Sequence, residues 1–560
     1  MSHDNNTRII VIGANAAGLR AGARAKRLLP NSSITVFDKS AYISYGACGM
    51  PYVVSGDIED ADELRKTPYG VVRDADFFRA AKGLEVITRT AVEKIDRQAK
   101  KVICRSVASG ETSEHPYDRL VIATGASPVM IPNIPSDSPR ISTFKTFEDG
   151  LKMQEAFQDG RINRIGLVGA GTIGCELAEA ASVMWGAGVV LIDAAPSILP
   201  AMLDPEMAGP IENYMRSEDA EVYTNCPLEG ITAPDDKVVM KTSCGEFEVD
   251  HAIIAIGVRP NSRLAADCGL EIGKSGGIVV DDRMTTSDPD IYAAGDCVEV
   301  KHHLTGQSVF MPLGSLANRE GRVVGSNLGG GDERFGPILG SAAVKVFDMN
   351  VSATGLTEKS AREAGFDVGT VWGSFTDIAE YYPDKQNIFL KLIYDKNSSR
   401  LLGLQGFSHG EVVKRIDVFA ALLKHDGKLD DLLDAEFAYA PPYAPAVDPL
   451  YSIGCTARNQ LYEGIEALPP DAVLDDKLII DVRRAQEASD RPLPEPNCQN
   501  LPFETFRDCC QQVSGDSEIV CACSKGVRAS DAVRILKQQG CPNVKYIGGG
   551  TLMKLAQKQD

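Results

Sequence analysis

The chain has 560 residues, of which 44% are hydrophobic, and a formal net charge of −19 at pH 7. That length exceeds what one hydrophobic core supports, so we expect several globular domains. The acidic excess argues against nucleic acid or an anionic membrane surface as the main partner, because both attract clustered positive charge.

The 14 cysteines are spread along the chain, which contains no CxxC pair and no HExxH motif. Such spacing argues against a disulfide framework and against structural zinc, so we expect no metal site. The first residues, MSHDNNTRIIVIG, run from a short polar tail directly into a strand. They show no signal-peptide pattern and no run of 18 apolar residues follows, so we expect a soluble cytoplasmic protein.

The first predicted unit, from TRIIVIG to TVFDKS, reads as strand, helix and strand and is typical of dinucleotide binding. Gly13, Ala17 and Gly18 lie at its turn, where small residues let the backbone approach a pyrophosphate at the helix N-terminus. Asp38 ends the second strand, where an acid can hold ribose hydroxyls. Asn15 replaces the usual middle glycine, so this segment alone leaves a generic strand-to-helix turn as an alternative.

The helix of this unit carries Arg20, Arg24 and Arg27, at a spacing that places their side chains on one face. A solvated basic face is one interpretation of this pattern. In so acidic a chain, the three guanidinium groups also form a dock for a phosphate-rich ligand. Coenzyme A, with its pyrophosphate and 3′-phosphate, fits that description.

Downstream, the stretch ISYGACGMPY contains one cysteine, Cys48, and the next cysteine is Cys104. An isolated cysteine is often an inert buried side chain. A single thiol that accepts electrons must be oxidised by something outside the chain, either as a mixed disulfide with a small thiol or as a sulfenic acid. The first chemistry predicts a disulfide or persulfide reductase, and the second predicts a peroxidase or a water-forming NADH oxidase.

A second dinucleotide unit is predicted at RIGLVGAGTIGCELAEAASVMWGAGVVLIDAA. Gly169, Gly171 and Gly174 follow its first strand, and Asp193 follows about 20 residues later, the spacing of an acid that holds the ribose. The two residues after Asp193 are alanines, which cannot pair with a 2′-phosphate, while the carboxylate would repel one. The segment therefore predicts binding of NADH in preference to NADPH.

Three further segments end a strand with a glycine turn: YDRLVIATGASP (117–128), DHAIIAIGVRPN (250–261) and TSDPDIYAAGDCVEV (286–300). In this order around the second unit, they resemble the two-dinucleotide flavoprotein disulfide reductase family. The resemblance implies that the first unit binds FAD and the second binds NADH. It also implies FAD contacts for Thr124, Gly125 and Asp296, the last on the ribitol.

The resemblance becomes closer at the cysteine loop, where SYGACGMPY is similar to the Ser-x-x-x-Cys loop of coenzyme A-disulfide reductases. Ser44 and Cys48 match, while the Asn that often precedes the cysteine is Ala47 here. The resemblance implies that Cys48 forms a mixed disulfide with coenzyme A. It also implies that Ser44, Asn318 and the three helix arginines line the coenzyme A site.

Two later segments, EYYPDK and AYAPPYAP, are similar to those with which this family presents tyrosines to the neighbouring subunit's active site. By position the resemblance selects Tyr381 and Tyr439, with Tyr382 and Tyr443 as close competitors. It implies a homodimer in which a tyrosine hydroxyl near Cys48 gives general-acid help to a departing thiolate. A proline-rich connector is the alternative interpretation of the second segment.

From about Pro469 the chain restarts with a linker, a strand in KLIIDVRR, and a strand, loop and helix in IVCACSKGVRASDAV. The loop from Cys523 to Arg528 should face the cysteine with backbone N–H groups at a helix start, and Lys525 and Arg528 add positive charge that favours a thiolate or persulfide. This loop resembles the rhodanese active loop, whose six residues suit a transferable sulfur atom. The Gly-His-Ile-Pro-Gly-Ala pattern usual before that loop is missing.

Together these segments predict an α/β protein with two Rossmann-like dinucleotide-binding domains, an α+β dimerisation domain and a C-terminal rhodanese-like α/β domain. The expected boundaries are 1–150 and 256–335 for the FAD domain, 151–255 for the NADH domain, 336–464 for the dimerisation domain and 465–560 for the rhodanese-like domain.

The whole chain is similar to fused coenzyme A-disulfide reductases that are also described as NADH-dependent persulfide or polysulfide reductases. The resemblance implies hydride transfer from NADH to FAD, opening of a mixed disulfide between Cys48 and coenzyme A, and handling of sulfane sulfur by Cys523. The substrate could be coenzyme A disulfide, coenzyme A persulfide, glutathione persulfide or polysulfide. Two alternatives stay open: an NADH oxidase or peroxidase that uses a Cys48 sulfenic acid, and a sulfurtransferase whose flavin portion only senses redox state.

Overall fold

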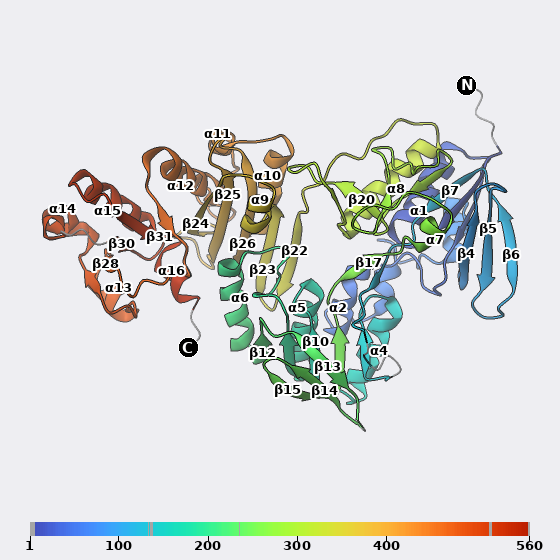
Figure 1. The fold of residues 1–560 in the computed structure, drawn as a ribbon, viewed down its shortest axis with the longest axis horizontal. Coiled ribbons are helices and arrows are strands. Elements are labelled where there is room, and N and C mark those ends of the chain that lie inside the picture. The colour runs from blue at the N-terminus through green and yellow to red at the C-terminus, as the bar shows by residue number, and fades with distance from the viewer. Residues whose placement is uncertain (1–5, 133, 135–137, 235, 514–517, 558–560) are drawn as a thin grey trace. The chain divides into compact units, whose positions relative to one another are not determined.

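The computed structural model describes residues 6–132, 134, 138–234, 236–513 and 518–557 of the chain (Figure 1). The chain divides into two compact units. Unit 1 comprises the described residues of Met1–Gly169, Leu177–Val190 and Leu228–Ile338. Unit 2 comprises those of Ala170–Glu176, Leu191–Pro227 and Leu339–Asp560.

The first sheet of unit 1 is a five-stranded parallel sheet. Its spatial order is β19 (Ile291–Ala293), β7 (Arg119–Ile122), β1 (Arg8–Ile12), β2 (Ser33–Phe37) and β3 (Glu85–Ile87). The central strands are almost entirely Ile, Val and Leu, as expected of a parallel sheet that is buried on both faces. The turns after β1, β7 and β19 open at one edge, because all three strands end there.

Helices α1 (Ala16–Leu28) and α8 (Gly314–Leu328) pack against each other beside this sheet (Figure 1). Their approach is close because two glycines of α8 face α1. A Cβ atom at Gly321 would overlap the carbonyl oxygen of Ala17, and one at Gly325 would lie 2.5 Å from the carbonyl oxygen of Ala21. This contact brings the first half of α8 next to the start of α1.

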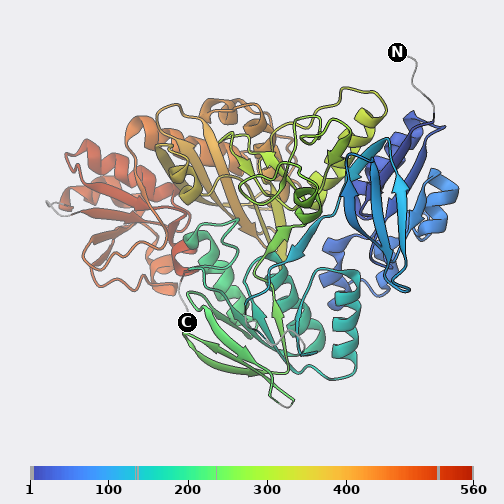
Figure 2. The same cartoon turned by 45° about the vertical axis from the view of Figure 1, so that its right-hand side comes forward.

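Unit 1 also contains antiparallel sheets. One consists of β4 (Thr90–Asp96), β5 (Lys101–Ser106) and β6 (Thr112–Pro116), drawn in blue in Figure 2, and another of β13 (Leu228–Thr232), β14 (Val238–Thr242) and β15 (Gly245–Val249). Shorter elements of unit 1 are α2 (Met50–Val54), α3 (Ala75–Phe77), β8 (Ala126–Pro128), β17 (Val258–Pro260), α7 (Arg263–Asp267), β18 (Ile278–Val279), β20 (Val298–Lys301) and β21 (Ser308–Val309).

A second Rossmann-like sheet forms around the second glycine turn. Its strand order is β12 (Ala220–Tyr223), β11 (Gly188–Ile192), β10 (Arg164–Val168), β16 (His251–Ile254) and β9 (Ile141–Thr143). Its helices are α4 (Phe147–Gln158), α5 (Thr172–Glu179) and α6 (Pro205–Ser217). Helix α4 begins with a capping box between Thr146 and Asp149, which satisfies two of its free backbone N–H groups.

The third part, in unit 2, is built on an antiparallel sheet. Its order is β22 (Ala342–Val346), β23 (Met349–Gly355), β26 (Leu401–Ser408), β25 (Asn387–Asp395) and β24 (Val368–Thr376). Its helices are α9 (Glu358–Glu363), α10 (Val413–Lys424), α11 (Leu429–Asp434) and α12 (Pro449–Glu463). Helix α10 packs on β23 and β26, and α12 packs on β24 and β25, so these two helices contact four of the five strands of the sheet.

The C-terminal part of unit 2 is again a parallel sheet. Its order is β27 (Ala467–Leu468), β31 (Val544–Ile547), β30 (Ile519–Ala522), β28 (Leu478–Asp481) and β29 (Cys498–Asn500). Its helices are α13 (Ala485–Asp490), α14 (Phe506–Cys509), α15 (Val527–Gln538) and α16 (Gly550–Leu555), and α14 and α15 share one hydrophobic core with the sheet (Figure 1). The predicted fold class is thereby confirmed. Within the described residues, no helix is long and apolar enough to cross a membrane.

Candidate active site

The first glycine turn has the tight geometry that the sequence predicts. Gly13 has a φ of +110°, and a Cβ atom there would overlap the carbonyl oxygen of Ala123. A Cβ atom at Gly18 would overlap the carbonyl oxygen of Gly13. Only glycine fits at either position, because both bring two backbone segments into contact. The two glycines therefore let the turn lie against Ala123 and let α1 start directly beside Gly13.

Asn15 has a structural task that explains why it is not glycine. Its Oδ1 accepts a hydrogen bond from the backbone N–H of Tyr45 at 3.0 Å. The N–H of Ser44, a residue with the left-handed φ of +53°, donates to the carbonyl oxygen of Ala14 at 2.9 Å. The glycine turn and the Cys48 loop are thus fastened to each other. The sequence contained no signal for this connection.

Acidic and polar side chains collect where the parallel strands of the first sheet end. Asp38 accepts the N–H of Ala14 at 2.7 Å, and burial raises the pKa of its carboxyl group. Thr124 donates to the carbonyl oxygen of Asn261 at 2.7 Å, next to Gly125 at a φ of +67°. These groups follow β2 and β7, as expected for a dinucleotide site at this edge.

Asp296 lies in the turn after β19, and its carboxylate is 3.3 Å from the Nζ of Lys145. Beside it is a residue that sequence reasoning missed, Glu320 of α8, which accepts the N–H of Gly295 at 2.6 Å. Burial, with a smaller contribution from Asp296, raises the pKa of Glu320 to about 7. The glycine turn at the start of α1 and the acids around it suit the pyrophosphate and the hydroxyl groups of FAD.

A pocket of about 460 Å³ opens beside the Cys48 loop. It contains four of the predicted coenzyme A contacts, Arg20, Arg27, Ser44 and Asn318. Sequence reasoning missed its other walls, which include Tyr69, Arg73, Phe77, Phe78 and Lys82. Arginine and lysine side chains on a partly apolar pocket suit a ligand that has both phosphates and an adenine or pantetheine portion.

Arg24 lies apart from its two neighbours on α1. Its Nε donates to the hydroxyl of Ser326 on α8 at 3.1 Å, and it is not among the residues that line the pocket. The close α1–α8 packing explains this, because Gly325 of α8 lies directly against the Arg24 side chain. Its role in coenzyme A binding stays a prediction.

Cys48 is exposed and lies in a single 3₁₀ turn, Ala47–Gly49, immediately before α2. Cys48 does not line the pocket, but Ser44, Tyr45 and Gly46 of its loop do. A ligand in the pocket would therefore lie next to the loop that carries the thiol.

The second glycine turn repeats the geometry of the first. Gly169 has a φ of +110°, and a Cβ atom there would lie 2.5 Å from the carbonyl oxygen of Ala255. Gly171 faces open space, and Gly174 is buried in α5. This arrangement again leaves room for a pyrophosphate at the start of a helix.

The Asp193 carboxylate, just beyond the end of β11, is held by backbone donors. The N–H of Ala170 donates to Oδ2 at 2.6 Å, and the N–H of Ala195 donates to Oδ1 at 2.7 Å. Two fixed N–H donors keep the side chain in one orientation beside the glycine turn. In this position the carboxylate can accept hydrogen bonds from the ribose hydroxyl groups of NADH, as the sequence predicts.

The two selected tyrosines meet in unit 2. The hydroxyls of Tyr381 and Tyr439 are 3.3 Å apart, and the residues are 75% and 50% exposed. Their competitors Tyr382 and Tyr443 are 39% and 69% exposed. The hydrogen bond raises the pKa of Tyr381, so this hydroxyl stays protonated at neutral pH.

Cys523 lies at the end of β30, inside the predicted loop. Its Sγ accepts the N–H groups of Gly526 at 3.2 Å and Ala529 at 3.3 Å, as expected from a cysteine that faces a helix start. The thiol is nevertheless buried, and burial raises its pKa more than these donors lower it. The donors that would stabilise a persulfide are present, but they do not make the resting thiol strongly acidic.

Both cationic side chains of this loop are already paired with carboxylates. Arg528 donates to both oxygens of Glu487 at 2.8 Å, and the Nζ of Lys525 lies 3.0 Å from Glu380. Sequence reasoning assigned these charges to Cys523 and missed their partners. The only signal for Glu487 was its place just after the DVRR strand end.

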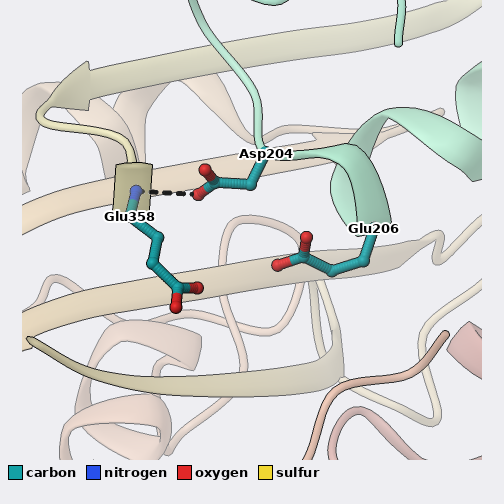
Figure 3. Close-up of side chains that lie close together, drawn as sticks. All are labelled: Asp204, Glu206 and Glu358. Atoms are coloured by element: carbon teal, nitrogen blue, oxygen red, sulfur yellow. Dashed lines mark hydrogen bonds between the residues drawn. The ribbon is translucent and has the colours of Figure 1, made fainter. Parts of the chain in front are cut away.

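Three carboxylates lie close enough to suggest a cation site in unit 2. They belong to Asp204, Glu206 and Glu358 and point toward one another in Figure 3. The ammonium group of Lys391 occupies this position: it is 2.9 Å from Asp204 and from Glu358 and also pairs with Glu206. This buried ammonium group pairs with all three carboxylates, so it takes the position that a metal ion would need.

Comparisons with known proteins give consistent assignments over the chain. The family model described as pyridine nucleotide-disulphide oxidoreductase matches residues 7–313, the model of that family's dimerisation domain matches 341–450, and the rhodanese-like domain model matches 459–552. The solved structure of an NAD-dependent persulfide reductase from A. fulgidus superposes with a TM-score of 0.94 at 39% identity, covering 98% of this chain and 99% of that chain.

Two curated relatives cover about four fifths of the chain. An NADH oxidase of Methanocaldococcus jannaschii is 33% identical over 443 residues, 79% of this chain and 97% of the relative. An NAD(P)H coenzyme A polysulfide/persulfide reductase of Pyrococcus horikoshii is 33% identical over 457 residues, 80% of this chain and 98% of the relative.

Proposed function

Because the chain belongs to the pyridine nucleotide-disulphide oxidoreductase family and carries that family's dimerisation domain and a rhodanese-like domain, we propose that it is an NADH-dependent persulfide reductase acting through Cys48. FAD and NAD(P)H are the cofactors typical of this family, and the homologues of the chain include coenzyme A-disulfide and coenzyme A-dependent persulfide reductases. The proposed substrates are coenzyme A persulfide, coenzyme A disulfide and polysulfide.

The observation that carries this proposal is the pocket beside the Cys48 loop. Arg20 and Arg27 of α1, Ser44 of the Cys48 loop and Asn318 of α8 all line this pocket. In a chain with a net charge of −19, cations gathered in one concave site attract a phosphate-bearing ligand. Coenzyme A bound there would bring its thiol end towards Cys48.

The two glycine turns have separate tasks in this proposal. The turn at Gly169, together with Asp193, holds NADH, and the carboxylate disfavours the 2′-phosphate of NADPH. The turn at Gly13, with Asp38 and Asp296, holds FAD. FAD, when bound, relays two electrons from NADH to the sulfur of Cys48.

The sulfur chemistry balances with one thiol. The Cys48 thiolate attacks the carbon-bound sulfur of coenzyme A persulfide, which forms a Cys48–coenzyme A disulfide and releases hydrosulfide. Two electrons then cleave this disulfide and leave the Cys48 thiolate and the coenzyme A thiolate. The net reaction consumes NADH, one proton and the persulfide, and yields NAD⁺, the thiol and hydrogen sulfide. With coenzyme A disulfide as substrate, two thiols form instead.

The chain is proposed to work as a homodimer in which Tyr381 and Tyr439 reach the active site of the neighbouring subunit. The Tyr381 hydroxyl stays protonated, because its hydrogen bond with Tyr439 raises its pKa. Such a hydroxyl can donate a proton to the departing thiolate. Cys523 is proposed to accept or deliver the sulfane sulfur.

An NADH oxidase that uses a Cys48 sulfenic acid is the second candidate, favoured by the similarity to the M. jannaschii relative of that name. The small molecule that a reductant releases from the native protein tells the two apart. Its mass should be that of coenzyme A if Cys48 rests as a mixed disulfide. If reduction releases no thiol, the coenzyme A assignment is wrong.

A further inference from the structure

The positive charges of the Cys523 loop are paired with carboxylates from outside the loop. The six residues from Cys523 to Arg528, all of which the structure describes, include two cationic side chains, Lys525 and Arg528. Each forms an ion pair with a carboxylate from outside the loop. Neither cation of these six residues is therefore left unpaired to bind an anionic sulfur donor.

The first of these pairs is a bidentate clamp. The two guanidinium nitrogens of Arg528 donate to the two oxygens of Glu487 on α13, each at 2.8 Å, and the Ser524 hydroxyl donates to the same carboxylate at 2.9 Å. The hydrogen bond from Arg528 is the main reason that the pKa of Glu487 falls to about 2. Glu487 is therefore fully ionised at neutral pH and occupies the donors that would otherwise bind an anion.

The second ion pair joins the Cys523 loop to the segment EYYPDK (380–385), which contains Tyr381. The Nζ of Lys525 lies 3.0 Å from Glu380, the residue that directly precedes Tyr381. A third carboxylate, Glu504, pairs with the nearby Arg484 at 2.7 Å. The surroundings of Cys523 thus hold carboxylates that match each of these cations.

We propose that Glu487 and Glu380 select the sulfur donor at Cys523, excluding inorganic dianions such as thiosulfate and admitting sulfane sulfur carried by an organic thiol. The proposal rests on the proposed function, in which Cys523 handles sulfane sulfur. A dianion at the loop would have to displace a carboxylate from a bidentate pair or accept its repulsion at close range. A thiol-borne persulfide brings much less charge to that point.

The transfer itself involves no external oxidant. The Cys523 thiolate attacks the terminal sulfur of the persulfide R–S–S⁻, a new bond forms between Cys523 Sγ and that sulfur, and the S–S bond of the donor breaks. The donor leaves as the thiolate R–S⁻ and takes up a proton from solvent. The product Cys523 persulfide accepts the N–H groups of Gly526 and Ala529, which now hold the resting thiol.

The test measures the rate at which Cys523 gains one sulfur atom in the full-length protein. Site-resolved mass spectrometry monitors this reaction, once with thiosulfate and once with glutathione persulfide as the donor. The parent should load from glutathione persulfide much faster than from thiosulfate. Glu487→Gln frees Arg528 and should raise the thiosulfate rate about tenfold or more, while the persulfide rate changes by less than about twofold. Glu380→Gln should shift the ratio of the two rates in the same direction.

Glu463→Gln is the matched control. Glu463 pairs with Arg534, which lies on α15 like Arg528 but outside the Cys523 loop. Its ratio of rates should equal that of the parent. The proposal is overturned if both test variants keep the parent ratio, or if the parent accepts thiosulfate as fast as the persulfide. If Glu487→Gln disturbs the loop and lowers both rates, Glu380→Gln alone decides. If neither donor loads the parent, the role of Cys523 in the proposed function fails instead.

Discussion

The hydroxyls of Tyr381 and Tyr439 lie 3.3 Å apart, although 58 residues separate them in the sequence. Tyr381 follows β24, and Tyr439 precedes α12. Two largely exposed tyrosines that share a hydrogen bond form one proton-donating pair, in which each hydroxyl orients the other. In the proposed homodimer, this pair reaches the active site of the neighbouring subunit and protonates the departing thiolate there.

Tyr381→Phe should lower kcat for coenzyme A persulfide by about 100-fold, because general-acid catalysis is typically worth a factor of this order. KM should change little, since the hydroxyl acts on the leaving group. Steady-state kinetics with Tyr443→Phe as control checks this prediction, because Tyr443 is also exposed but lies outside the pair. Equal effects of both variants would refute the assignment.

Arg20→Gln and Arg27→Gln should each raise KM for coenzyme A persulfide by about 10-fold or more, because each removes a charged hydrogen-bond donor from the pocket. Arg24→Gln should have a smaller effect, since Arg24 contacts Ser326 instead. KM for inorganic polysulfide, which has no phosphates, is the internal control. An equal rise for both substrates would contradict the docking site.

Asp193→Ser combined with Ala194→Arg should shift the preference from NADH towards NADPH. The change removes a carboxylate that repels the 2′-phosphate and adds a cation that pairs with it. The ratio of kcat/KM for the two nucleotides measures the shift. If that ratio stays at the parent value, Asp193 does not contact the ribose.

Glu320 makes the stability of the protein depend on pH in a defined direction. The pKa of Glu320 is raised to about 7 in the folded protein. Its contribution to the free energy of unfolding is therefore fully present below the pKa that Glu320 has in the unfolded chain, and it is lost as the pH rises through neutrality. The expected loss between pH 5 and pH 8 is on the order of 3 kcal/mol. Unfolding of the FAD-free protein in denaturant should therefore show a smaller pH dependence for Glu320→Gln than for the parent. If the stability of the parent and of Glu320→Gln depends on pH in the same way, the raised pKa of Glu320 is refuted.

The turns of the two dinucleotide units could be predicted from the sequence because their glycines act locally: Gly13 and Gly169 are required by the backbone that each of them touches. Ion pairing depends instead on residues distant in the chain. Arg528 meets Glu487 and Lys525 meets Glu380 only after the chain has folded. The same holds for Arg24, whose helix face was predicted but whose partner Ser326 lies 302 residues away.

The central claim is that Cys48 links NADH oxidation to cleavage of a persulfide. Anaerobic NADH oxidation with coenzyme A persulfide, measured together with hydrosulfide release, tests it for the parent and for Cys48→Ser. The parent should release one hydrosulfide for each NADH, and the variant should lose at least about 1,000-fold in rate, because a hydroxyl at neutral pH is not an ionised nucleophile. Turnover that requires oxygen, or a variant that retains the parent rate, would contradict the account.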